Sequence, residues 1–277
     1  MNDLAISVTG LRKSYGPTEI LHGIDLGVHR GETLAVLGPN GAGKTTTVEI
    51  LLGLLPRDDG EVRVLDADPA KADRAHRARV GIVAQYANDL LELTVDEALR
   101  HFARYYPNPR DPRRVIEDVG LAQQAGKRVR QLSGGQRRRL DVAVGIIGSP
   151  ELLLMDEPTT GFDPEARQQF WELTRELARQ GTTILLTTHY LDEAEALADR
   201  VAIIDDGRIA AVGPVASLVD PETVTVTWDD GVKRTTRPAA LVTELSESYG
   251  GEVPGLTVTR ESLADVYTRI IDEEAAA

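Results

Sequence analysis

The stretch Gly38–Thr45, GPNGAGKT, decides how this 277-residue sequence is interpreted, because it matches the pattern G-x-x-x-x-G-K-[ST]. It follows a strand-like segment, RGETLAVLG, and precedes a predicted helix, KTTTVEILLGLL, that Pro56 stops. In such a loop, backbone N–H groups surround phosphates, a lysine neutralises phosphate oxygens, and a threonine hydroxyl can bind Mg²⁺. Both flanking elements argue against a chance glycine-rich turn. The predicted phosphate site comprises Gly38, Pro39, Asn40, Gly41, Ala42, Gly43, Lys44, Thr45 and Thr46.

A second chemical signal is the pair of acids in LLLMDEP, residues 152–158. The continuous apolar run before them is typical of a strand buried in a parallel sheet. Asp156 is the candidate ligand for Mg²⁺, and Glu157 is the candidate general base that activates water. Two acids can also simply end a strand, but the upstream phosphate loop favours the catalytic interpretation.

The segment Leu132–Gln136, LSGGQ, has the features of a second anion site. Ser133 is a predicted helix cap, and the glycines after it leave the N–H groups of the helix start accessible to a phosphate. The arginines at 137–139 are interpreted as a solvated helix face rather than a nucleic-acid patch. One chain therefore carries two predicted phosphate sites.

The composition is that of a globular protein, with 42% hydrophobic and 27% charged residues. The absence of cysteine excludes disulfides, zinc–thiolate sites and thiol catalysis. No segment resembles a secretory signal, and no apolar run approaches the roughly 20 residues that span a bilayer, so we expect a soluble chain. The net charge of −13 repels phosphate backbones, so no nucleic-acid partner is expected.

Strand and helix patterns alternate along most of the chain, which predicts the α/β class with a mostly parallel core. A helical insertion is predicted at about 88–148, where Thr94 and Glu97 form a plausible capping box. Residues 200–213 read as a hairpin with a tight Asp-Gly turn. We expect one domain at 1–218 and a small α+β appendage at 219–277, made of a hairpin and two helices.

Taken in order, these motifs resemble those of the ATP-binding cassette (ABC) ATPases, the nucleotide-binding subunits of ABC transporters. The resemblance runs from about residue 4 to residue 218, and LSGGQ is the family signature. It implies a P-loop NTPase core with an N-terminal antiparallel β part, ATP and Mg²⁺ as ligands, and ATP hydrolysis. It also implies four roles: adenine stacking by Tyr15, contact with Mg²⁺ and water by Gln85, a D-loop at Asp163, and γ-phosphate contact by His189.

The resemblance also accounts for the two phosphate sites. In this family two cassettes dimerise head to tail, so the signature of one subunit closes on ATP held by the other. For this chain that implies a homodimer in which the partner's ATP is contacted by Ser133, Gly134, Gly135, Gln136 and Asp163.

Three segments resemble the exporter-type subfamily that includes drug-resistance ATPases and partners of ABC-2-type permeases: LTVDEALRHFARYY, LLTTHYLDEAEALADRVAIIDDGRIAAVG and ESLADVYTRI. Phe162 and Tyr267 stand where leucine and phenylalanine are commoner. This resemblance implies an export subunit on the inner face of the cell membrane, docked on its permease around Gln85 and Asn88–Glu92.

Two alternatives remain at this stage. One is an importer ATPase with a C-terminal regulatory domain. The other is a soluble ABC ATPase that acts on nucleic acid or ribosomes, which is disfavoured by the single cassette, the lack of zinc modules and of a long coiled-coil insertion, and the net charge of −13.

Overall fold

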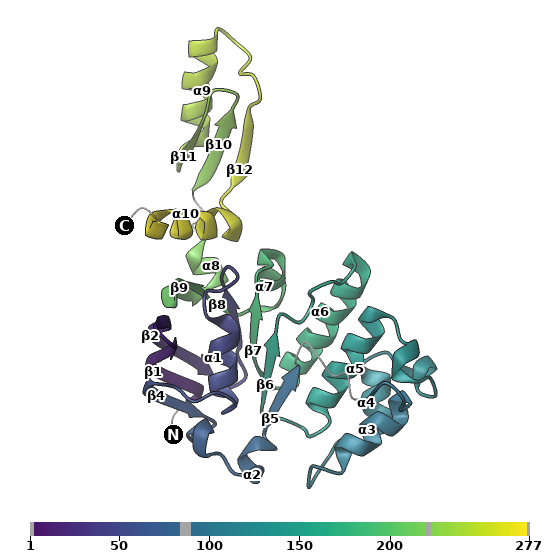
Figure 1. The fold of residues 1–277 in the computed structure, drawn as a ribbon. Helices are drawn as coiled ribbons and strands as arrows, with labels where there is room; N and C mark the ends of the chain where they lie inside the picture. The colour runs from purple at the N-terminus through teal and green to yellow at the C-terminus, as the bar shows by residue number, and fades with distance from the viewer. Residues whose placement is uncertain (1–2, 84–89, 220–222, 276–277) are drawn as a thin grey trace. The chain divides into compact units, whose positions relative to one another are not determined.

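The computed structural model describes residues 3–83, 90–219 and 223–275. It consists of two compact units, Met1–Ala211 and Val212–Ala277 (Figure 1). Among the described residues, no helix has the length and apolar character that crossing a bilayer requires.

The chain begins with a three-stranded antiparallel sheet. Its strands are β1 (Leu4–Tyr15), β2 (Thr18–His29) and β4 (Asp59–Val64), in the order β2-β1-β4. The apolar side chains of β1, including Ile6 and Leu11, are fully buried. The expected N-terminal antiparallel part is thereby confirmed.

The central sheet has the order β5-β6-β7-β3-β8-β9, and its first five strands are parallel. Every residue of β3 (Thr33–Leu37) and β7 (Thr183–Thr188) is buried, because both faces of the sheet are covered. The other strands are β5 (Val80–Val83), β6 (Leu152–Asp156), β8 (Arg200–Asp205) and β9 (Arg208–Pro214). The predicted tight turn joins β8 to β9, with φ of 38° at Asp206 and 69° at Gly207.

Helix α1 (Lys44–Leu51) is shorter than the pattern indicated. We expected it to continue to Pro56, but it stops before Gly53, whose φ of 69° lies in the left-handed region that commonly ends helices. A glycine in the last part of an apolar run, rather than the following proline, sets this boundary.

The predicted helical insertion contains α3 (Val95–Ala103), α4 (Pro112–Asp118) and α5 (Gly134–Ile146), which lie together in Figure 1. Both predicted helix starts are confirmed, since Thr94 with Glu97 and Ser133 with Gln136 form reciprocal capping boxes. The remaining elements of this unit are η1 (Pro69–Lys71), α2 (Arg74–Arg77), η3 (Ala122–Gln124), η4 (Val129–Gln131), α6 (Pro164–Arg179) and α7 (Leu191–Leu197).

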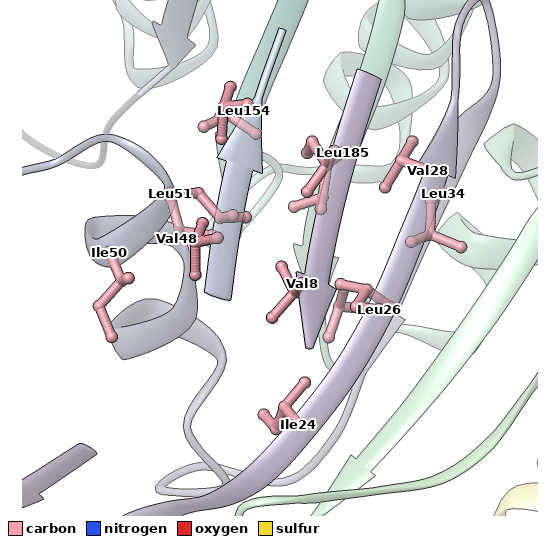
Figure 2. Close-up of a cluster of buried hydrophobic side chains, with 14 of the residues drawn as sticks. Val8, Ile24, Leu26, Val28, Leu34, Val48, Ile50, Leu51, Leu154 and Leu185 are labelled. Atoms are coloured by element: carbon pink, nitrogen blue, oxygen red, sulfur yellow. The ribbon is translucent and has the colours of Figure 1, made fainter. Parts of the chain in front are cut away.

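The main hydrophobic core joins the two sheets to α1. Figure 2 shows side chains from β1 and β2, such as Val8 and Leu26, together with Leu51 of α1 and Leu154 and Leu185 of the central sheet. Because this burial holds α1 between the sheets, the loop before α1 has a fixed position relative to the strand ends.

The second unit is a small α+β structure. Strands β10 (Val224–Trp228), β11 (Gly231–Thr235) and β12 (Thr257–Arg260) form an antiparallel sheet in the order β11-β10-β12. Its helices are α8 (Val215–Leu218), α9 (Pro238–Tyr249) and α10 (Leu263–Ala275), and α9 packs on β10. The hairpin and both longer helices were expected, whereas β12 was not, because its four residues are all exposed and carry no burial pattern.

We predict that Gly207→Ala destabilises the first unit by about 1–3 kcal/mol, the cost of a strained left-handed residue. A Cβ at this position would also lie 2.1 Å from the carbonyl oxygen of Ile20. Chemical unfolding followed by circular dichroism measures the effect. Gly126→Ala is the matched control, because its Cβ would meet no atom within 4 Å. Equal unfolding midpoints for the two variants would contradict the prediction.

Candidate functional site

The phosphate loop connects β3 to α1 and is shaped by its glycines. Gly43 has a φ of 102°, and a Cβ there would lie 2.4 Å from Leu21, so this position requires glycine. The Lys44 amino group donates hydrogen bonds to the carbonyl oxygens of Gly38 and Pro39 at 2.8 and 3.0 Å. Lys44 is only 5% exposed, so its charge is held inside the loop.

A cavity of about 260 Å³ opens beside this loop. Tyr15 of β1, which is 49% exposed, lines it together with Glu157 from the end of β6. An aromatic ring left half in solvent at a cavity is available for stacking on a flat ligand. The cavity is further lined by Ile20, Asn40, Gly41, Gly43, Lys44, Thr45 and Thr46.

Asp156 lies where three elements meet. One of its carboxylate oxygens accepts a hydrogen bond from the Thr45 hydroxyl of α1 at 3.0 Å, and the other accepts one from the Thr187 hydroxyl of β7 at 2.5 Å. A hydroxyl and a carboxylate at this spacing are hard oxygen donors, the ligand type that Mg²⁺ prefers. Thr45 and Asp156 therefore fit a magnesium ion that accompanies bound phosphates.

Glu157 follows directly and has a φ of 44°, an unusual conformation for a residue with a side chain. Its carboxylate oxygens lie 3.4 Å from the Lys44 amino group and 3.4 Å from Nδ1 of His189. The Thr160 hydroxyl donates to the same carboxylate at 3.4 Å. Two predicted site residues, Lys44 at the start of α1 and His189 just after β7, thus meet at the carboxylate of a third, Glu157, just after β6.

The signature segment forms a separate cavity of about 650 Å³. Ser133 caps α5 by accepting a hydrogen bond from the Gln136 N–H at 3.3 Å, and the Gln136 side chain returns a bond to the Ser133 N–H at 3.2 Å. Asp163 caps α6 by accepting from the Ala166 N–H at 2.8 Å. The cavity lining includes Ser133, Gly134, Gly135, Gln136, Gly161, Phe162 and Asp163.

The two predicted phosphate sites share no lining residue. Within one chain the structure brings the phosphate loop together with Tyr15, Asp156, Glu157 and His189, but not with the signature. Gln85, the remaining predicted site residue, lies outside the described residues.

A phosphate loop, a hard-oxygen pair and a neighbouring glutamate at the ends of parallel strands define a P-loop ATPase. The family model described as "ABC transporter" matches residues 21–160. A Nod factor export ATP-binding protein of Ralstonia nicotianae is 41% identical over 266 residues, or 94% of this chain and 77% of that protein. This chain belongs to the ABC transporter family, as one of its ATP-hydrolysing nucleotide-binding subunits.

Two further comparisons are relevant. A daunorubicin resistance ATP-binding protein of Streptomyces coeruleorubidus is 45% identical over 223 residues, or 79% of this chain and 71% of that protein. A solved ATP-binding cassette, in a dimeric post-hydrolysis state with ADP and Pi, matches with a TM-score of 0.68 and 24% identity. That match covers 76% of this chain and 98% of the cassette, and it supports the fold.

Sequence reasoning missed several polar residues behind the site. Thr187 is one of six buried residues in β7, and nothing in TILLTT distinguishes it from a packing threonine. Glu193 of α7 is fully buried, and burial raises its pKa. The arginine run was interpreted as a solvated face, and this is wrong for Arg138, which is 7% exposed. A run of three arginines turns through a helix, so one member faces inward.

We predict that Glu157→Gln lowers kcat by at least about 100-fold, because an amide cannot accept the proton of the attacking water. ATP affinity should stay within twofold, since the amide can keep the contact with Lys44. Phosphate release and binding of a fluorescent ATP analogue measure the two quantities. Lys44→Ala is the comparison variant, and it should weaken nucleotide binding itself. Normal hydrolysis by Glu157→Gln would rule out the general base.

Proposed function

We propose that two copies of this chain close head to tail around two ATP molecules. The observation that carries the proposal is the division of the site into two cavities that share no residue, one with the phosphate loop and one with the signature. The binding site around a phosphate held by the loop is complete only if a second copy presents the N-terminus of its α5. That helix start supplies N–H groups, a hydroxyl and the positive end of a helix dipole.

Within each composite site, we assign Thr45, Asp156 and Gln85 to Mg²⁺, which offsets the charge on the phosphates when it is bound. Tyr15 stacks on adenine, and Lys44 leaves the loop carbonyls to contact the β- and γ-phosphates. The signature residues and Asp163 contribute from the other copy.

Glu157 accepts a proton from the water that attacks the γ-phosphorus, and the bond to the β,γ-bridging oxygen breaks to release ADP. His189 is assigned to the γ-phosphate, because its ring lies 3.4 Å from the Glu157 carboxylate. ATP contacts that exist only in the closed dimer drive closure, and their loss on hydrolysis reopens it.

We propose that this ATPase cycle powers export through a separate membrane permease of the ABC-2 type. The names of the relatives, a Nod factor export protein and a daunorubicin resistance protein, support export over import. The subunit would then lie on the cytoplasmic face of the cell membrane, held there by its permease.

An apolar depression of about 180 Å³ supports a docking surface at the edge of the central sheet. Its lining includes Leu54, which is 71% exposed, and Ile82 of β5, just before the predicted docking segment. Of that segment, 88 and 89 lie outside the described residues, whereas Glu92 is exposed and pairs with Arg128 and Arg130. Exposed apolar side chains beside Arg77, which also lines the depression, suit a short apolar segment of the permease.

We predict that Ser133→Arg leaves ATP binding to the monomer unchanged, because Ser133 does not line the phosphate-loop cavity. In a Glu157→Gln background, size-exclusion chromatography should show that ATP no longer produces a dimer. Ser248→Arg, at an exposed serine of α9, is the matched control. Mixing Ser133→Arg chains with Lys44→Ala chains should restore part of the ATPase activity, since the mixed dimer holds one complete site. Full activity of Ser133→Arg alone would contradict the head-to-tail arrangement.

We predict that Leu54→Asp, and separately Glu92→Arg, lowers coupled transport at least tenfold while the ATPase activity of the free subunit stays within twofold. Leu54→Asp introduces an unpaired charge in the apolar depression, and Glu92→Arg reverses an exposed charge and breaks its ion pairs with Arg128 and Arg130. Transport into vesicles that contain the co-purified permease provides the measurement. Val232→Asp, at an exposed valine of β11, is the control. Unimpaired transport by both variants would exclude this surface.

A further inference from the structure

Arg138 is a charged residue buried behind the catalytic strand end. It lies on α5, four residues after the start of the helix at Gly134, and is 7% exposed. Its Nε donates to the Pro158 carbonyl at 2.7 Å, and its Nη2 donates to the Asp156 carbonyl at 3.2 Å. The contact with the Asp141 carboxylate is longer, at 3.6 Å. A guanidinium is kept in such a place only if its donors are well paired.

The two carbonyls belong to the residues on either side of Glu157. Glu157 has a φ of 44°, and a non-glycine residue in this region costs about 1–3 kcal/mol unless its surroundings hold it. From β7, Thr187 accepts the Glu157 N–H at 3.1 Å with its carbonyl and at 3.1 Å with its hydroxyl. Arg138 therefore holds from the α5 side the same backbone that Thr187 holds from the β7 side.

Arg138 also connects two functional parts of the chain. Its helix, α5, begins at the signature, which lines one of the two cavities. Its guanidinium bonds the backbone on both sides of Glu157, whose carboxylate lines the other cavity. The planar guanidinium can bond two carbonyls at once in a fixed geometry, which a lysine ammonium does not reproduce.

We propose that Arg138 is a positioning residue. It holds the strained backbone at Glu157, and it couples the orientation of the Glu157 carboxylate to α5, the helix that begins at the signature of the same chain. This inference rests on the proposed general-base role of Glu157. It predicts that engagement of the signature by one nucleotide and alignment of Glu157 toward the other are mechanically linked within each subunit.

The test is a double-mutant cycle between Arg138→Met and Glu157→Gln. Arg138→Met alone should lower kcat at least tenfold, with KM and monomer ATP affinity within twofold. In the Glu157→Gln background it should lower the residual kcat by less than twofold, because the residue that it aims is already disabled. A purely structural role would instead lower kcat by the same factor in both backgrounds, and that result would overturn the proposal.

Arg138→Lys is the second variant, and thermal unfolding verifies that each protein is folded. The lysine keeps the charge but cannot bridge both carbonyls, so the kcat of Arg138→Lys should still fall severalfold. Wild-type kcat in Arg138→Lys would overturn the proposal even if Arg138→Met does not fold. Arg179→Met, at an exposed arginine of α6, is the control and should keep wild-type kcat. If Glu157→Gln is inactive but Arg138→Met keeps wild-type kcat, this inference fails while the general base stands. Normal turnover by Glu157→Gln would remove the general base itself.

Discussion

The parallel register of β6, β7 and β3 brings the phosphate loop, the two acids and His189 to one edge of the central sheet. Asp156 of β6 pairs with Thr187 of β7. Leu37 of β3, the last residue before the phosphate loop, pairs with Thr188 of β7. The carboxyl ends of adjacent parallel strands form one edge of a sheet, which is where ligands bind in open α/β folds. The loop, the acids and His189 therefore converge although they lie far apart in the sequence, because the strands that end beside them are paired.

A second constraint follows from the helical insertion. It holds the signature apart from the phosphate loop, so that a single chain presents two separate cavities. In the proposed head-to-tail dimer, function would be a property of a pair of chains, and nucleotide would be part of the contact between them. Arg138 gives this arrangement a physical link inside each chain, because it joins the helix of one half-site to the peptide backbone of the other.

Local signals predicted much of the fold and the site. The capping boxes at Thr94 and Ser133 and the turn at Asp206 are formed by hydrogen bonds and backbone preferences within a few residues, and they were predicted correctly. The errors have longer-range or weaker causes. The end of α1 depended on the conformation of one glycine, β12 has no buried face, and the burial of Arg138 depends on carbonyls about twenty residues away.

Contiguous residues specify the chemistry of the phosphate loop, the acidic pair and the signature, and the alternation of strands and helices, because each of these patterns is local. Which of these groups meet depends on how the whole chain folds. The fold joined Glu157 to Lys44 and His189, gave Asp156 its two hydroxyl partners, and kept the signature in a cavity of its own. Strand register and helix packing bring distant residues within hydrogen-bonding distance, and both are set by burial of the whole core rather than by any local pattern.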